Sequence, residues 1–542
     1  NWVIDSLNAN MPFDRFVTEQ IAGDLLPSLD RKQLERQHTG TGFLVVGPKL
    51  LNEPNTSLIY RMGVVDDQID TTFRAFMGLT VGCARCHEHF YDPISTNDYY
   101  ALAGIFRSTK NLAGVKSNNN YIDNGLLPLG EDGQAIIDEI QIAEAHFKAV
   151  TPPFVAARRE DTNLQNQLDD AKAASAAADE IARLEKELEA AKILHKATLK
   201  TFQDARTAIP EPPPSVMAVK EGDAADCELF QAGDVGQAGD RIPRGSLEFL
   251  HPIETIAANE SGRMQLARWI TNPENPLTSR VIVNRVWGHL FGVGLVDTPD
   301  NFGVLGASPT HPELLDHLAG QFIKNEWNLK DLIKTLMLSR VYRLSSEHSD
   351  AAVAADAGNR LRWRMSPRRL EGEAIRDSLL FVAGRLDLTQ LESSVVSENG
   401  AFETKIEILD QLRASHDHGL YRSVYLPVMR AALPDMMSIF DAPDPSMVSG
   451  QRKTSTVAPQ ALFLMNSPFV LEQTSGAAQQ LLDRFSEDAE RIESAFLLLL
   501  SRAPTNEERS LLTQFMSAGE PLENWTEICH GLIASGEFRF IY

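Results

Sequence analysis

Cysteine is scarce in this chain, whose 542 residues contain four. So few thiols exclude a small domain held together by a framework of disulfides. Cys227 and Cys529 each stand far from any other cysteine. They either pair with each other or remain buried free thiols, and the sequence leaves both alternatives open. The other two cysteines lie close together, and their spacing is the most informative feature of the chain.

Long apolar runs and an excess of positive charge are also missing. The longest apolar candidate, residues 495–500, is far shorter than the roughly 20 residues of a membrane-spanning helix. The 51 basic residues are outnumbered by 74 acidic ones, which gives a formal net charge of −23. We therefore expect no membrane span and no binding to nucleic acid. The acidity favours a well-solvated surface, and an acidic docking face for a basic partner is the alternative.

Several motifs of common enzymes are absent as well. The chain has no G-x-S-x-G, no P-loop, no G-x-G-x-x-G fingerprint and no H-E-x-x-H, which removes the enzyme classes that these motifs define. The first residue is not methionine, and Val3, Ile4, Leu7 and Phe13 already show helical spacing. We expect a leader segment upstream of residue 1.

The stretch Cys83-Ala84-Arg85-Cys86-His87 is a C-x-x-C-H pentad, the covalent attachment signature of c-type haem. The two intervening residues place both sulfurs on one helical turn, where each can add to one vinyl group of the porphyrin. The adjacent His87 is then the proximal iron ligand. Arg85 is placed to pair with a haem propionate, a task suited to arginine. The pentad predicts one covalently bound haem c held by Cys83, Cys86, His87 and Arg85.

The ligand on the opposite side of the iron does not follow from the spacing. Met77, Met62 and His89 are the candidates near the pentad, and His38 and His251 are more distant ones. Methionine would raise the reduction potential, histidine would lower it, and an open position would admit small ligands. A zinc site that includes His89 and a redox-active cysteine pair are the rival interpretations of the pentad.

Hydrophobic periodicity predicts a mainly α, multidomain chain. We expect a helical cytochrome-type domain over residues 1–130, a coiled-coil or helical-hairpin connector over 131–208, a linker with a small β element over 209–254, and a helical domain over 255–542. Within this last domain, residues 368–382 and 458–466 are predicted helices and residues 423–426 a β-like run.

The connector is rich in Ala, Glu, Lys, Gln and Asp and nearly free of aromatic residues. Its apolar positions alternate three and four residues apart, as is typical of a coiled-coil seam. The seam positions are Leu164, Leu168, Ile181, Leu184, Leu188 and Ala191. Pro152-Pro153 interrupts the helical pattern and favours a hairpin. We expect an arm that packs within the chain, and a dimerisation arm is the alternative.

Two groups of charged residues have plausible partners nearby in the sequence. The first group is Asp66, Asp67, Asp70, Arg74 and Arg85, which predicts a salt-bridged surface beside the pentad. The second group is Arg368, Arg369, Glu371, Glu373, Arg376 and Asp377, whose spacing predicts ion pairs within one helix. A catalytic carboxylate pair that includes Asp441 and Asp444 is the alternative for the second group. Trp287 and Trp363 would suit stacking on a sugar.

Longer runs of sequence resemble two known families. The first runs are Asp66-Asp67-Gln68, residues 78–89, Asp92-Pro93-Ile94 and residues 98–106. They resemble the second planctomycete cytochrome-type domain, which contains the pentad. Further runs are Asn275-Pro276-Leu277-Thr278, Asn284-Arg285-Val286-Trp287, residues 297–303 and residues 457–462. These resemble its companion, a planctomycete-specific domain of unknown function. The resemblance implies a large secreted protein, often with a separate cytochrome c domain upstream, and no established reaction.

These features predict a c-type haem protein of the periplasm or cell exterior. It would perform electron transfer or haem-dependent redox chemistry with a redox partner protein or an upstream cytochrome domain. Whether it is an enzyme stays open, with a haem-dependent oxidoreductase as the candidate class. One alternative is a polysaccharide-associated enzyme or binding protein with its cleft in the C-terminal domain. The other is an assembly or scaffold protein that forms an oligomer.

Overall fold

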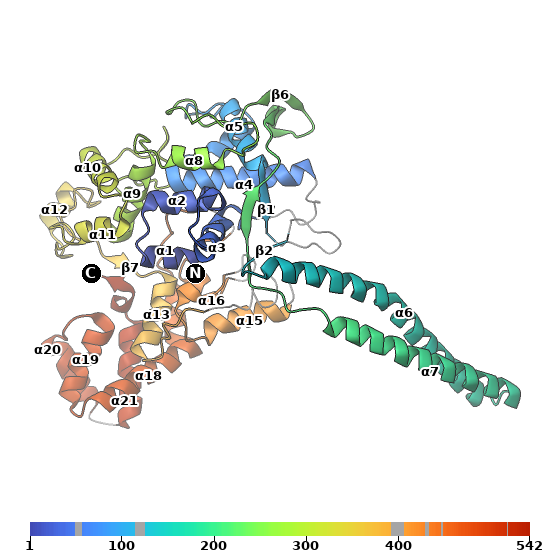
Figure 1. The fold of residues 1–542 in the computed structure, drawn as a ribbon. Helices are drawn as coiled ribbons and strands as arrows, with labels where there is room; N and C mark the ends of the chain where they lie inside the picture. Colours follow the sequence, from blue (N-terminus) through green and yellow to red (C-terminus); the bar gives the residue numbers. More distant parts are fainter. Residues whose placement is uncertain (49–56, 114–124, 392–405, 429–432, 446–447, 517–518) are drawn as a thin grey trace. The chain divides into compact units, whose positions relative to one another are not determined.

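The computed structural model describes residues 1–48, 57–113, 125–391, 406–428, 433–445, 448–516 and 519–542. The chain divides into two compact units, which we call the main unit (residues 1–124 and 219–542) and the arm (residues 125–218). Both units are mainly helical, and the described strands form two-stranded sheets (Figure 1). The predicted fold class is therefore confirmed, while the domain boundaries expected near residues 130, 208 and 254 stay predictions.

The arm is a pair of long helices, α6 (Gly133–Ala173) and α7 (Ala178–Thr207), which lie side by side (Figure 1). Antiparallel pairing of β2 (Leu127–Pro128) with β3 (Ser215–Val216) joins the two ends of the arm. The predicted seam is buried between the helices, with Ile181 packed against it. Its buried members are Leu164, Leu168, Leu184, Leu188 and Ala191.

The proline pair at residues 152–153 lies inside α6, so the prediction that it interrupts the helix is wrong. The chain turns instead at residues 174–177. Proline removes a helical hydrogen bond and crowds the preceding turn, but aromatic packing on both sides of the pair holds α6 against α7. Phe154 stacks on Phe202 with ring centroids 4.5 Å apart, and Phe147 meets the same ring at 4.9 Å.

The main unit begins with the helical part that carries the pentad. Its elements are α1 (Trp2–Asn8), α2 (Phe13–Ala22), the 3-10 helix η1 (Gly23–Leu25), α3 (Arg31–Gly40), η2 (Thr41–Leu44), α4 (Leu58–Met77), η3 (Val81–Arg85), α5 (Thr96–Arg107) and β1 (Thr109–Leu112). Gly78 ends α4 with a φ of +61°, which glycine adopts without strain. α5 begins at a capping box in which Ser95 and Asp98 bond each other's backbone N–H. The C-terminus of α4 and the N-terminus of α5 are therefore well defined, and they fix the ends of the segment that contains the pentad.

The β element follows the arm. Its members are β4 (Ala218–Glu221), β5 (Cys227–Phe230), η4 (Gln231–Gly233) and β6 (Ala238–Ile242). β4 pairs with β1, and β5 pairs with β6 as an antiparallel hairpin. This hairpin packs on α5 and so lies close to the pentad.

The rest of the main unit is helical. Its elements are α8 (Arg263–Ile270), α9 (Thr278–Phe291), α10 (Pro312–Lys324), α11 (Leu329–Met337), α12 (Asp350–Ala355), β7 (Arg368–Arg369), α13 (Gly372–Val382), α15 (Ile406–Asp417), η5 (Ser423–Tyr425), α16 (Asp435–Ile439), α17 (Ala458–Asn466), α18 (Pro468–Arg484), α19 (Asp488–Leu500), α20 (Asn506–Phe515), α21 (Pro521–Ala534), η6 (Glu537–Arg539) and β8 (Phe540–Ile541). The core of its last part is a cluster of buried side chains from α13, α16 to α19, α21 and η6, with Trp525 among them. The helix predicted at residues 458–466 is confirmed as α17.

Two local predictions in this part are wrong. Residues 368–382 are not one helix, because Arg368–Arg369 form β7, which pairs with β8, and α13 starts at Gly372. Residues 423–426 are not a strand but contain η5. Asp377 holds this turn, since its carboxylate accepts hydrogen bonds from the backbone N–H and the hydroxyl of Ser423 at 2.8 and 2.7 Å. Both differences come from partners distant in the sequence.

Among the described residues, no helix has both the length and the apolar character needed to cross a membrane.

Candidate functional site

The first three residues of the pentad end the η3 turn, and Cys86 is its C-cap. In a 3-10 helix, residues three apart lie on the same face. Val81 and Ala84 share the inner face and are fully buried, whereas Cys83 and Cys86 share the outer face and are exposed. Both thiols are free. The turn therefore presents two exposed sulfurs on one face while its apolar side anchors it to the core.

His87 follows directly and is also exposed. Its Nδ1 lies 2.7 Å from the carbonyl oxygen of Glu88, and its ring contacts Phe90 with centroids 4.3 Å apart. A carbonyl partner makes Nδ1 the protonated nitrogen, so the lone pair stands on Nε2. A hydrogen bond of this kind is what orients histidine ligands in metal sites.

His89 is tied into the turn after the pentad. Its Nδ1 accepts hydrogen bonds from the backbone N–H groups of Asp92 at 2.9 Å and Tyr91 at 3.3 Å. Its Nε2 lies 3.2 Å from the hydroxyl of Thr80. Both ring nitrogens are therefore engaged in shaping residues 80–92. This is a positioning role for His89.

Two tyrosines of α5 hold Arg85 of the pentad in place through hydrogen bonds. The Tyr99 hydroxyl donates to Asp66 at 2.7 Å, and Asp66 also pairs with Arg85 at 3.3 Å. The Tyr100 hydroxyl lies 3.0 Å from the carbonyl oxygens of both Arg85 and Phe230. Burial raises the pKa of Tyr100 to about 12, so it stays a neutral donor. α5 thus fixes the backbone and the side chain of Arg85.

The predicted salt-bridged surface beside the pentad is confirmed for two pairs. Arg85 pairs with Asp66 at 3.3 Å, and Arg74 pairs with Asp70 at 2.8 Å. Arg85 is half-buried in this arrangement. Its role toward a propionate stays a prediction.

The β5–β6 hairpin reaches the pentad at Gly233. A Cβ atom at this position would lie 2.7 Å from the sulfur of Cys86, and φ is +76°. Glycine is therefore required here, both for the backbone conformation and for the close approach. At the other end of β5, Arg107 of α5 pairs with Glu228 at 2.6 Å, which joins the hairpin to α5. This hydrogen bond from Arg107 lowers the pKa of Glu228 to about 2.

Glu228→Gln is expected to destabilise the protein in a pH-dependent way. A carboxyl whose pKa is lowered on folding stabilises the fold above its ordinary pKa of about 4.5, and this contribution disappears as the pH falls through about 2. We expect the variant to lose about 1 kcal/mol of unfolding free energy at pH 7, since solvent partly screens the pair. The melting temperatures of the native protein and the variant should differ at pH 7 and converge as the pH falls toward about 2. An equal difference in melting temperature at both pH values would contradict this assignment.

The structure buries the two methionine candidates for the distal ligand, whereas the thiols of the pentad are exposed. Met62 and Met77 are fully buried side chains of α4, and His89 is engaged as described above. His38 and His251 lie on other segments, and burial lowers the pKa of His38. The identity of the ligand opposite His87 stays a prediction.

The chemistry of the donor set fits covalent haem better than zinc. Among the described residues, no group of three or more His, Cys, Asp or Glu side chains is arranged to hold a metal ion. Two free thiols on one face and an adjacent histidine with an oriented ring are what c-type attachment requires. Cys227 and Cys529 are buried and free, so they do not pair.

Most charged residues of the second group, between Arg368 and Asp377, bind partners other than those predicted. Ion pairing within one helix is confirmed for Arg376 and Asp377 of α13, at 3.8 Å. Arg369 pairs with Asp441 at 2.6 Å instead, and Glu373 pairs with Arg452 at 2.6 Å. Arg376 is buried and donates to backbone carbonyls of residues 416–421. The cluster therefore joins separate segments of the chain.

The residues expected to line a sugar-binding cleft are otherwise engaged. Trp287 is buried and stacks on Phe291 with centroids 4.1 Å apart. The carboxylate of Asp441 is occupied by Arg369 and by Ser455. The Trp363 ring is covered by the guanidinium of Arg364 at 4.7 Å.

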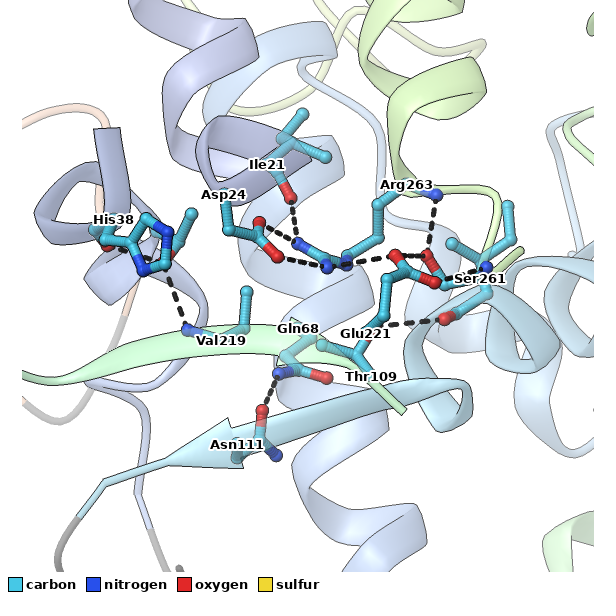
Figure 2. Close-up of polar contacts among 12 residues, drawn as sticks. Ile21, Asp24, His38, Gln68, Thr109, Asn111, Val219, Glu221, Ser261 and Arg263 are labelled. Atoms are coloured by element: carbon cyan, nitrogen blue, oxygen red, sulfur yellow. Dashed lines mark hydrogen bonds and ion pairs between the residues drawn. The ribbon is translucent and has the colours of Figure 1, made fainter. Parts of the chain in front are cut away.

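Sequence reasoning missed a buried polar cluster around Arg263 (Figure 2). Arg263 donates to both carboxylate oxygens of Asp24 at 2.6 and 2.8 Å and to Glu221 at 3.1 Å. Glu221 in turn accepts from the backbone N–H and hydroxyl of Ser261. No local spacing signals this cluster, because its members come from distant parts of the chain.

Comparison with known families identifies both ends of the main unit. The family PSCyt2, described as a protein of unknown function (DUF1549), matches residues 1–111, and PSD1, described as a protein of unknown function (DUF1553), matches residues 262–516. The part that carries the pentad thus matches a family named as a planctomycete cytochrome-type domain. In this chain a PSCyt2 domain is followed by a PSD1 domain, and both are planctomycete-type domains. The resemblance seen in the sequence is confirmed. No curated protein and no solved structure matches the chain.

Proposed function

We propose that this protein is a c-type haem protein of the periplasm or cell exterior that exchanges single electrons with a partner. The observation that carries the proposal is the geometry of the pentad. Cys83 and Cys86 are free, exposed thiols on one face of η3, and the neighbouring His87 is exposed with an oriented ring. The cytochrome-type family of the domain supports the same conclusion.

Each residue of the pentad has a distinct task in this proposal. The thiols of Cys83 and Cys86 would hold the haem by adding across its two vinyl double bonds, with sulfur bonding to one carbon and the thiol hydrogen going to the other. Such an addition would involve no net oxidation or reduction. His87 would hold the iron through Nε2, because Nδ1 is held by the Glu88 carbonyl. Once bound, the haem supplies one-electron redox chemistry.

Arg85 has a positioning role and a second task. Asp66 fixes its side chain, and Tyr100 lies 3.0 Å from its carbonyl oxygen. A guanidinium carries five N–H donors, so it can donate hydrogen bonds to Asp66 and to a haem propionate at the same time. We propose Arg85 as the propionate partner on this basis.

The charge of the chain indicates the kind of redox partner that it would bind. A formal charge of −23 suits a redox partner protein with a basic docking face, and a cytochrome domain upstream of this chain is the other candidate donor or acceptor. Should the protein catalyse a reaction, it would belong to the haem-dependent oxidoreductases.

Changing both cysteines tests the proposal. When the native protein is made in cells that mature c-type cytochromes and is then reduced, it should show an absorption band at ~550 nm, and the haem should stay bound after denaturation because it is covalently attached. Cys83→Ser with Cys86→Ser should abolish it. Cys227→Ala, which removes a thiol outside the pentad, should keep the band. Absence of the band from the native protein, or its persistence in the double variant, would refute the proposal.

A further inference from the structure

A loop of the PSD1 domain, residues 302–306, lies against both ends of the pentad segment. The backbone N–H of Phe302 donates to the carbonyl oxygen of Gly78 at 2.7 Å, just before the pentad. The backbone N–H of Val304 donates to the carboxylate of Asp92 at 2.6 Å, just after it. The loop therefore bridges the two ends of residues 78–92.

The loop has little freedom at these contacts. Asp92 is buried, and a Cβ atom on Gly303 would lie 2.3 Å from its carboxylate oxygen. The Gly303 N–H donates to the Asn301 side chain at 2.9 Å, and the Gly306 N–H donates to the Gly303 carbonyl at the same distance. The loop is thus a folded turn with a fixed position beside the pentad segment.

Large apolar side chains are exposed on both of these neighbouring segments. Phe90 and Tyr91 are 78% and 56% exposed, and Val304 and Leu305 are 67% and 60% exposed. Single exposed apolar residues are normal, but a group of them at one place marks a binding surface. Asp92 joins the two segments, and Phe90 already contacts the His87 ring.

We propose that Val304 and Leu305 of the PSD1 domain, together with Phe90 and Tyr91, form the apolar surface on which the haem of the PSCyt2 domain packs. The inference rests on the proposed haem attachment. Haem is the occupant because its porphyrin is a broad apolar plate, and the proposed thioethers tether it to the very segment that carries Phe90 and Tyr91. In this arrangement the haem site is completed by the second family domain. That would explain why the loop contacts both ends of the pentad segment.

The test compares Val304→Ser with Leu305→Ser against a matched control. The control, Leu338→Ser with Leu361→Ser, removes two exposed leucines from other segments, 65% and 71% exposed. Haem content, reduction potential and circular dichroism in the Soret band are measured on the whole protein. Greater solvent exposure lowers the potential of a haem. We expect unchanged haem content, a lower potential and an altered Soret signal in the loop variant, and none of these changes in the control.

The outcomes separate this inference from the proposed function. Native protein without haem would overturn the attachment itself and, with it, the packing surface. Native protein with haem, and a loop variant that matches it in potential and Soret signal, would overturn the packing surface alone. Equal changes in the control would also overturn it. Far-UV circular dichroism verifies folding, and the milder Leu305→Ser variant, expected to shift in the same direction, replaces the double variant if that one fails to fold.

Discussion

Arg263→Ala is expected to lower the free energy of unfolding by about 3–5 kcal/mol, the usual cost of removing one partner from a buried ion pair. Arg263 is fully buried, and the Asp24 side chain is 4% exposed. Figure 2 shows the guanidinium between Asp24 and Glu221. Without Arg263, the Asp24 carboxylate would remain in the interior without its cation. Denaturation in urea, followed by circular dichroism, measures the loss.

The same helix supplies a control for this prediction. Arg268 of α8 pairs with Glu254, and both side chains are more than half exposed, at 60% and 58%. Arg268→Ala should therefore lower the free energy of unfolding by less than about 1 kcal/mol. Asp24 belongs to the PSCyt2 match and Arg263 to the PSD1 match, so we expect Arg263→Ala to weaken both domains together. Similar costs for the two variants would contradict the assigned role of the buried pair.

Trp525→Ala is expected to lower the free energy of unfolding by about 3–5 kcal/mol, as truncation of a large buried aromatic side chain does. Trp525 is 1% exposed in the buried cluster formed by α13, α16 to α19, α21 and η6. Alanine would leave a cavity, since the surrounding helices are held by several other contacts and can close only partly around it.

Leu522 lies one turn earlier on the same helix and is 42% exposed. Leu522→Ala should change the stability by less than about 1 kcal/mol, because it removes little buried area. Hydrogen exchange would locate the effect of Trp525→Ala in the C-terminal helices. A loss no larger than that of Leu522→Ala would show that this cluster does not stabilise the domain.

The features that were predictable from the sequence are those set by local pattern. The alternation from Leu164 to Ala191 predicted the seam of the arm, since three-four spacing places side chains on one face of each helix. The helix at residues 458–466 followed from periodicity and appears with the same bounds. The pentad was visible as five consecutive letters, and the structure adds that both thiols share one exposed face.

The features that were not predictable depend on contacts between distant residues. Arg369 has a local carboxylate at Glu373, yet it pairs with Asp441, because β7 is drawn away from α13 by its pairing with β8. The cluster around Arg263 and the loop at residues 302–306 join segments more than 200 residues apart. Short-range spacing carries no information about such neighbours. The part of the site that lies outside the pentad could therefore not be predicted from the sequence.

Covalent attachment of haem at the pentad is tested most directly by the intact mass of the full chain from cells that mature c-type cytochromes, measured after denaturation. We expect a mass equal to that of the polypeptide plus one haem, with the added mass located by proteolysis on the peptide that contains Cys83 and Cys86. A mass equal to that of the polypeptide alone would contradict it.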